Sequence, residues 1–272
     1  MAEQIQGDGA GPAVETFELV RRFGDFTAVG GIDLRVERGQ FFGFLGPNGA
    51  GKSTTIKMLT GLLAPTGGRV RVLGRDVAAE PLEVKRRIGV VPEDLNLFER
   101  LTGAEMLSFT GRMFGLGRGD TALRSRELLE LMELDAEPRR LVVEYSHGMK
   151  KKLALACALI HRPEVLFLDE PFEGVDAVAS RTLKDLLSRL TARGVTVFLT
   201  SHVLEIVERL CTHIAIISAG RLVAAGPLEE LRRGISVGGV EGAGAALSLE
   251  DYFISVVGGT REAGADALGW LG

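Results

Sequence analysis

The sequence predicts an α/β fold with a mostly parallel sheet at its core, an N-terminal antiparallel β subdomain and an inserted α-helical subdomain. Strand-like and helix-like segments alternate through residues 149–218. A glycine-rich loop joins a buried strand to a helix near residue 46, and apolar residues take the helical period within residues 95–158. Alternating strands and helices favour parallel strands with helices on both faces of the sheet.

Length and composition are those of one α/β domain with appendages. The chain has 272 residues, of which 46% are hydrophobic and 25% are charged. The formal net charge of −4 provides no overall basic surface for nucleic acid. We expect a cytoplasmic protein, because the sequence has no long apolar run and does not begin like a secretory signal. Cys157 and Cys211 stand in apolar runs and are predicted to be buried hydrophobes.

The chain divides into three parts. Residues 1–13 are predicted to be a flexible N-terminal leader, and residues 14–234 the main domain, with a helical subdomain at about 95–158. Residues 235–272 are predicted to be a Gly/Ala-rich linker, a short helix and a tail, with Ser248 and Asp251 at the start of that helix.

Each element of the main domain has its own sequence signal. Residues 14–36 alternate in hydrophobicity as antiparallel strands do, residues 40–45 form an apolar strand, and residues 65–77 read as a turn and a hairpin. Another strand ends in VVPED. The later elements are expected as helices at 149–160, 178–192 and 204–210, and as strands at 165–168, 195–199 and 214–218.

A phosphate-binding loop follows the strand at residues 40–45. The pattern GxxxxGK[ST] is matched by Gly46, Pro47, Asn48, Gly49, Ala50, Gly51, Lys52 and Ser53. Backbone N–H groups of such a loop and the N-terminus of the following helix bind a polyphosphate. Lys52 is expected to neutralise phosphate oxygens, Ser53 to bind Mg²⁺ and Thr54 to add a phosphate hydrogen bond. These residues predict a P-loop NTPase that binds a nucleotide together with Mg²⁺, although the loop alone does not separate a kinase, a GTPase and a transporter motor.

Two further strands end in polar residues. The apolar segment EVLFLDEP ends in Asp169, a candidate Mg²⁺ ligand, and Glu170, a candidate base for the attacking water. The segment VTVFLTSH ends in Thr200, Ser201 and His202. Because ligands bind at the carboxyl edge of parallel sheets, we expect His202 to contact the γ-phosphate and the attacking water.

The order of these motifs resembles the ATP-binding cassette (ABC) ATPases across about residues 14–231. The signature segment of that family falls on Tyr145, Ser146, His147, Gly148 and Met149. Phe23 stands where an aromatic residue stacks on adenine, Glu93 stands at the Q-loop, and Gly174, Val175 and Asp176 correspond to the D-loop.

The resemblance implies a second ABC ATPase chain as partner, expected to be an identical copy. Two cassettes would pack head to tail, with Ser146 and the Gly148 amide contacting the γ-phosphate in the partner's site. The resemblance also implies separate integral membrane permease subunits, attachment to the inner face of the cell membrane and export, as in antibiotic and drug resistance systems. Some apolar residues of the helical subdomain are expected to line a groove for a permease helix.

The signature region departs from the family pattern. Glu93 replaces glutamine, although a carboxylate can still bind Mg²⁺ or its water. His147 replaces glycine and Met149 replaces glutamine. Our hypothesis is that His147 packs on the helical subdomain, away from phosphate. The Lys150, Lys151 and Lys152 run is interpreted as a solvated helix face.

Two other functions are weighed. A soluble ABC ATPase could act on nucleic acid or the ribosome, but the interval from Lys52 to Asp169 is too short for a long coiled coil, and the cassette is not repeated. A P-loop small-molecule kinase gives no role to the signature or to the strand that ends in His202. Recovery in washed membranes with an all-helical partner would distinguish the transporter from both.

Overall fold

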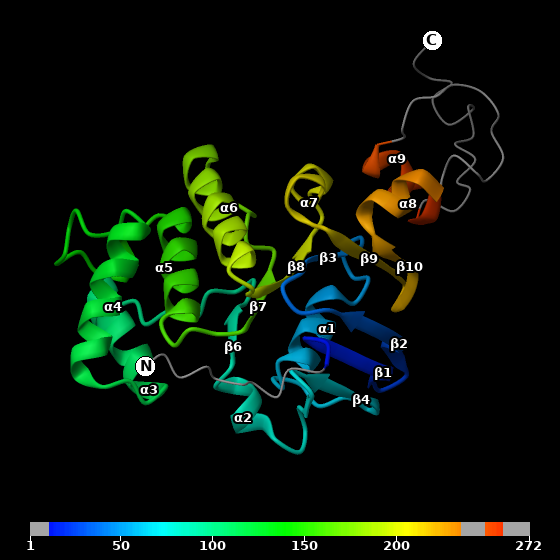
Figure 1. The fold of residues 1–272 in the computed structure, drawn as a ribbon, viewed down its shortest axis with the longest axis horizontal. Helices are drawn as coiled ribbons and strands as arrows, with labels where there is room; N and C mark the ends of the chain where they lie inside the picture. Colours follow the sequence, from blue (N-terminus) through cyan, green and yellow to red (C-terminus); the bar gives the residue numbers. More distant parts are fainter. Residues whose placement is uncertain (1–10, 235–247, 258–272) are drawn as a thin grey trace, which may run out of the picture.

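The computed structural model describes residues 11–234 and 248–257, which form two β-sheets flanked by helices (Figure 1). Most of the predicted leader, the Gly/Ala-rich linker and the tail lie outside these residues. Ala13, which we expected in the leader, is buried. Its amide donates to the carbonyl of Val36 at 2.8 Å, and its carbonyl accepts from the amide of Leu73 at 2.9 Å. The main domain therefore includes Ala13.

The six-stranded sheet has the order β10-β9-β3-β8-β7-β6. Neighbouring strands are parallel except β10 and β9, so the prediction of a mostly parallel core is confirmed. Its strands are β3 (Phe41–Leu45), β6 (Ile88–Val91), β7 (Val165–Asp169), β8 (Thr196–Ser201), β9 (His213–Ser218) and β10 (Arg221–Pro227).

Both faces of this sheet are buried, which explains its continuous apolar strands. Successive residues of a strand point to opposite faces. Phe167 therefore joins one hydrophobic cluster with Phe198, at a ring centroid distance of 5.6 Å, whereas Leu166 and Leu168 join the cluster on the other face. The sheet is thus held rigidly at the edge where its polar strand ends meet.

The four-stranded sheet is antiparallel and confirms the predicted N-terminal β subdomain. In the order β2-β1-β4-β5, its strands are β1 (Val14–Phe23), β2 (Phe26–Val36), β4 (Gly67–Val72) and β5 (Arg75–Asp76). The tight β1–β2 connection places Phe23 opposite Phe26. This hairpin end lies beside the phosphate loop, because both line one pocket.

The predicted helical subdomain forms a group of helices to one side of the sheets (Figure 1). It contains α3 (Gly103–Met113), α4 (Arg118–Leu131), the 3-10 helix η1 (Val142–Glu144) and α5 (His147–Leu159). Thr102 and Glu105 form a capping box at the start of α3. Leu107 of α3 and Leu153 of α5 are fully buried in the shared core. Apolar residues of α3 and α5 thus form the buried core of this subdomain, whereas the buried residues of α4 itself are Thr121 and Ser125.

Four of the remaining helices of the main domain connect strands, and the fifth follows β10. The four are α1 (Lys52–Leu59), α2 (Pro81–Lys85), α6 (Ala177–Ala192) and α7 (Leu204–Leu210), and the fifth is α8 (Leu228–Gly234). α1 starts directly after the phosphate loop, and α6 and α7 start shortly after β7 and β8. Because β3, β7 and β8 are parallel neighbours, their carboxyl ends meet at one edge: Asp169 pairs with Thr200, and Leu45 with Ser201.

Residues 248–257 include a short helix, α9 (Leu249–Val257), which packs on the main domain near α7 (Figure 1). The Ser248 hydroxyl accepts from the Asp251 amide at 3.2 Å and caps the helix. Leu249 is fully buried, and its amide donates to the Glu208 carboxylate at 2.8 Å. Within residues 11–234 and 248–257, every helix is too short or too polar to span a membrane.

Candidate nucleotide-binding site

The phosphate loop lies between β3 and α1, and its backbone approaches its neighbours closely at two glycines. A β-carbon on Gly46 would lie 2.3 Å from the carbonyl oxygen of Ile217. Gly51 has a φ of +110°, and a β-carbon there would lie 2.6 Å from the carbonyl oxygen of Ala28. The glycines thus let the loop wrap tightly before α1, whose N-terminus is the end of a helix that favours anions.

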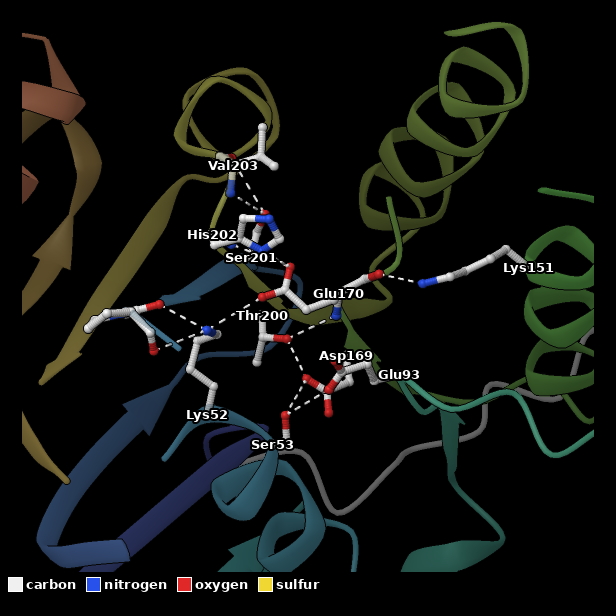
Figure 2. A network of polar contacts seen from close by, with 12 residues as sticks. Lys52, Ser53, Glu93, Lys151, Asp169, Glu170, Thr200, Ser201, His202 and Val203 are labelled. Atoms are coloured by element: carbon white, nitrogen blue, oxygen red, sulfur yellow. Dashed lines mark hydrogen bonds and ion pairs between the residues drawn. The ribbon is translucent and has the colours of Figure 1, made fainter. Parts of the chain in front are cut away.

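Lys52 is buried at the centre of this loop. Its ammonium donates to the carbonyl of Gly46 at 2.8 Å and lies 3.4 Å from the carbonyl of Pro47. It also lies 3.5 Å from Glu170 Oε1. A positive charge is therefore fixed among the loop carbonyls and beside the acidic end of β7 (Figure 2).

Oxygen atoms converge beside Ser53. The Ser53 hydroxyl lies 3.3 Å from Asp169 Oδ1 and 3.3 Å from Glu93 Oε2. The Thr200 hydroxyl donates to Asp169 Oδ1 at 2.6 Å and accepts from the Glu170 amide at 3.0 Å. No set of three His, Cys, Asp or Glu side chains in the described ranges could hold a metal ion by itself. This oxygen set suits a cation such as Mg²⁺ that takes its other ligands from phosphates and water.

Glu170 is held from two sides and is buried. Its Oε2 lies 3.0 Å from His202 Nδ1 and 3.3 Å from the His202 amide (Figure 2). Its Oε1 is buried without a hydrogen bond among the described residues and faces Lys52. Buried oxygens are normally satisfied. Glu170 Oε1 therefore has an unused acceptor position beside Lys52, which could accept a hydrogen bond from a bound water.

Lys52, Ser53, Glu93, Glu170 and His202 line one pocket of about 480 Å³, and Asp169 and Thr200 lie behind its wall. Phe23 and Phe26 also contribute to its wall, and they are 46% and 64% exposed. The guanidinium of Arg21 lies 4.4 Å from the centre of the Phe23 ring. The residues that line the pocket are Phe23, Phe26, Ala28, Asn48, Gly49, Gly51, Lys52, Ser53, Thr54, Glu93, Glu170, Glu173 and His202.

The signature residues lie elsewhere on the chain. Among the described residues, the pocket wall includes none of Ser146, His147, Gly148 and Met149. Ser146 caps α5, and its hydroxyl accepts from the Met149 amide at 3.2 Å. A β-carbon on Gly148 would lie 3.5 Å from Asp176 Oδ2, so α5 and α6 begin side by side. One chain therefore does not bring its signature to its own pocket.

One expectation about this region is wrong. The ring of His147 lies beside Gly174, where an added β-carbon would be 2.9 Å from Cδ2, because α5 begins beside the loop that leads to α6. Packing of His147 on the helical subdomain stays a hypothesis. The lysine run, however, is not a solvated face. Lys151 and Lys152 are buried, since α5 inserts them between the helical subdomain and the sheet edge.

Known families and structures match this chain. A family model described as ABC transporter covers residues 29–173, more than half of the chain. The chain belongs to the ABC transporter family. The fold class and family resemblance stated above are confirmed, and the protein is an ATP-binding ATPase of that family.

Individual relatives agree with this assignment of the ABC ATPase. This chain is 43% identical over 212 residues to a daunorubicin resistance ATP-binding protein of Streptomyces coeruleorubidus. The match covers 78% of this chain and 67% of that protein. The chain is also 39% identical over 213 residues to a linearmycin resistance ATP-binding protein of Bacillus subtilis (strain 168), covering 78% and 68%. A solved structure of an ATP-binding subunit of an ABC transporter superposes with a TM-score of 0.81 at 30% identity, covering 90% of this chain and 99% of that one.

Sequence reasoning missed several residues of the ABC ATPase pocket. Thr200 was noticed at a strand end, but its bridge between Asp169 and Glu170 depends on the β7–β8 register. Phe26 was missed although it stands three positions after Phe23, on the same hairpin. Glu173 lines the pocket from the loop after β7, and no motif marks it.

Proposed function

We propose that the protein is the motor subunit of an exporter, and that it couples ATP-driven closure of a cassette dimer to transport by separate membrane subunits. The observation that carries the ATP-hydrolysis part of the proposal is the placement of Glu170. Its carboxylate lies between His202 and Lys52, and its buried Oε1 has no hydrogen bond among the described residues.

The pocket residues divide into binding and positioning roles. ATP would place its phosphates against the loop from Gly46 to Thr54, with Lys52 neutralising charge and Phe23 or Phe26 stacking on adenine. Ser53, Asp169 and Glu93 would hold Mg²⁺ directly or through water, and the metal supplies charge neutralisation at the phosphates. Lys52 would exchange its loop carbonyl and Glu170 contacts for phosphate oxygens.

Hydrolysis would use Glu170 and His202. Glu170 Oε1 would accept a proton from the attacking water, because it is the buried oxygen without a hydrogen bond. His202 would fix the other oxygen and reach the γ-phosphate. Thr200 would hold the backbone of Glu170 and the carboxylate of Asp169 in place.

The site would be completed by a second copy of the chain. Ser146 and the Gly148 amide stand at the N-terminus of α5, outside the chain's own pocket, and a helix N-terminus favours an anion. In a head-to-tail dimer they would contact the γ-phosphate bound by the partner. His147 would remain against Gly174 and leave this end of α5 accessible.

The exporter assignment rests on relatives that are named for daunorubicin and linearmycin resistance. By analogy, the membrane subunits would export a small hydrophobic molecule, and the cassette would attach at the inner face of the cell membrane. Cargo selection would belong to those subunits, because the pocket found here is built for a nucleotide.

The test is Mg²⁺-dependent ATP hydrolysis by wild type and by Glu170→Gln, with size-exclusion chromatography in ATP. We expect the specific activity of wild type to rise with protein concentration. The variant should lose activity, by about 100-fold or more if Glu170 is the general base, and should accumulate an ATP-bound dimer. A variant that keeps wild-type turnover would remove Glu170 from the mechanism. Recovery of the chain from washed membranes tests the transport role separately.

A further inference from the structure

Glu170 has an unusual backbone conformation for a residue with a side chain. Its φ is +47°, in the left-handed region that β-carbons disfavour. Such a conformation persists only where surrounding contacts hold it. The amide of Glu170 is held by the Thr200 hydroxyl at 3.0 Å. Its carbonyl accepts from the Lys151 ammonium at 2.6 Å and from the Glu173 amide at 3.3 Å.

Lys151 reaches this carbonyl from α5 through the protein interior (Figure 2). Its side chain is 2% exposed. Burial lowers the pKa of its ammonium, while the carboxylates of Glu173, Glu170, Glu93 and Asp169 act in the opposite direction. Burying an ammonium is costly, and an apolar residue of similar volume often stabilises such a position equally well. A lysine here is therefore better explained by what it contacts than by core packing.

The two neighbouring lysines of the run, Lys150 and Lys152, pair with carboxylates away from Glu170. Lys150 pairs with Glu99 at 2.8 Å, and Lys152 pairs with Glu133 at 2.9 Å. Lys152 is also buried, yet its partner belongs to the turn after α4 and lies outside the nucleotide pocket. Of these three lysines, Lys151 is the one that reaches the backbone of the candidate catalytic glutamate.

We propose that Lys151 is a positioning residue that holds Glu170 in its left-handed conformation and ties the signature helix α5 to the catalytic carboxylate of the same chain. The expected effect of Lys151 on ATP hydrolysis rests on the function proposed above. Ser146 and Lys151 stand on one helix, so a dimer would join the partner's ATP, through α5, to the chain's own Glu170. Closure of one nucleotide site would then set the geometry of the other.

The first experiment compares Lys151→Met, Lys151→Arg and Lys152→Met. Lys151→Met removes the donor but keeps an unbranched, mostly apolar side chain, and Lys151→Arg keeps a donor. Misplacing a catalytic group costs about 10- to 100-fold in rate. We expect kcat of Lys151→Met to fall by that factor with KM for ATP within about twofold, because the phosphate loop is untouched. Lys151→Arg should recover most of kcat, and Lys152→Met should keep it.

A second measurement needs no turnover. Hydrogen–deuterium exchange of the nucleotide-free protein reports the amides of Glu170, Phe172 and Glu173 in one peptide. Exchange there should accelerate in Lys151→Met and stay unchanged in Lys152→Met and Lys151→Arg. Unchanged exchange in a folded Lys151→Met protein would overturn the positioning role, whether or not the wild type hydrolyses ATP.

A mixing experiment tests which chain Lys151 serves. A limiting chain with intact Glu170 is combined with a large excess of the Glu170→Gln chain, so that turnover comes from mixed dimers. Lys151→Met in the limiting chain should lower turnover about 10-fold, whereas the same change in the excess chain should have less than a twofold effect. Equal losses from both placements would contradict the proposal. Wild-type chains without concentration-dependent activity would instead contradict the proposed dimer, and the exchange result would still decide the role of Lys151.

Discussion

At the scale of single residues, Thr200 contacts two of the candidate catalytic and metal-binding residues at once. One hydroxyl donates to Asp169 and accepts from the Glu170 amide, so it fixes a candidate metal ligand and a candidate base together. Asp169 and Glu170 are adjacent in sequence, but they need different orientations. The bridge from β8 provides them without any charge of its own.

We predict that Thr200→Val reduces ATP hydrolysis by about 10- to 100-fold and raises the Mg²⁺ concentration needed, because Asp169 loses its anchor. The buried groups left unpaired should cost about 1–3 kcal/mol of unfolding free energy. Thr196→Val is the matched control at the other end of β8, where the hydroxyl accepts from the Gly39 amide at 2.9 Å. It should lose stability but keep activity. Equal activity losses in both variants would show a general effect of strand β8.

The lysine run illustrates at the same scale why part of the site could not be predicted. Three adjacent lysines have the composition of a solvated surface, and the sequence offers no sign that two are buried. Their burial depends on hydrogen-bond acceptors from other elements, which are the Glu170 carbonyl for Lys151 and the Glu133 carboxylate for Lys152.

At the scale of elements, α5 and α6 begin side by side and both have side-chain caps. Ser146 caps α5, and Asp176 caps α6 by accepting from the amides of Val178 and Ala179 at 2.9 Å. Asp176 Oδ2 would lie 3.5 Å from a β-carbon on Gly148, so the cap of α6 lies beside the start of α5. Stability of this corner should depend on the charge state of Asp176.

The hydrogen bond from the Ala179 amide is the main cause that lowers the pKa of Asp176 below its ordinary value of 3.8, and the Val178 amide adds to it. A carboxyl with a lowered pKa stabilises the fold fully above its ordinary pKa, and this contribution disappears as pH falls through the folded value. Asp176→Ala should therefore unfold at lower urea than wild type at neutral pH, and the gap should narrow below 3.8. Asp176→Asn, which keeps a cap, should stay close to wild type at neutral pH. A gap that is constant with pH would contradict this account.

At the scale of the whole molecule, a second pocket of about 380 Å³ lies where the helical subdomain meets the core. Its wall is mainly apolar, and it includes the segment that follows Glu93. The residues that line it are Thr60, Leu62, Lys85, Ile88, Val90, Pro92, Leu95, Asn96, Leu97, Met106, Thr110, Phe114, Ala154, Cys157, Ala158 and His161. We expected apolar residues of the helical subdomain to line a groove for a permease helix, and we propose this pocket, called the groove below, as that docking site.

We predict that Leu62→Asp lowers the fraction of the chain that sediments with washed membranes of its own cells. Leu62 is 62% exposed at the edge of the groove, so a charge there should disfavour an apolar partner without unfolding the cassette. Leu82→Asp is the control, because Leu82 is 69% exposed and outside the groove wall. ATPase activity of both purified variants should match wild type. Equal sedimentation of the two variants would rule out this groove as the docking site.

Local patterns in the chain were sufficient to predict the α/β core and which motifs lie together. Strand and helix periodicities are local properties, and parallel strands bring their carboxyl ends to one edge. For that reason Lys52, Asp169 and His202 could be placed near one another from strand ends alone. The contacts of Thr200 and His147 and the burial of Lys151 could be seen only in the folded molecule. These depend on strand register and on how α5 packs beside Gly174 and the end of β7, and long-range packing of this kind leaves no periodic pattern in the chain.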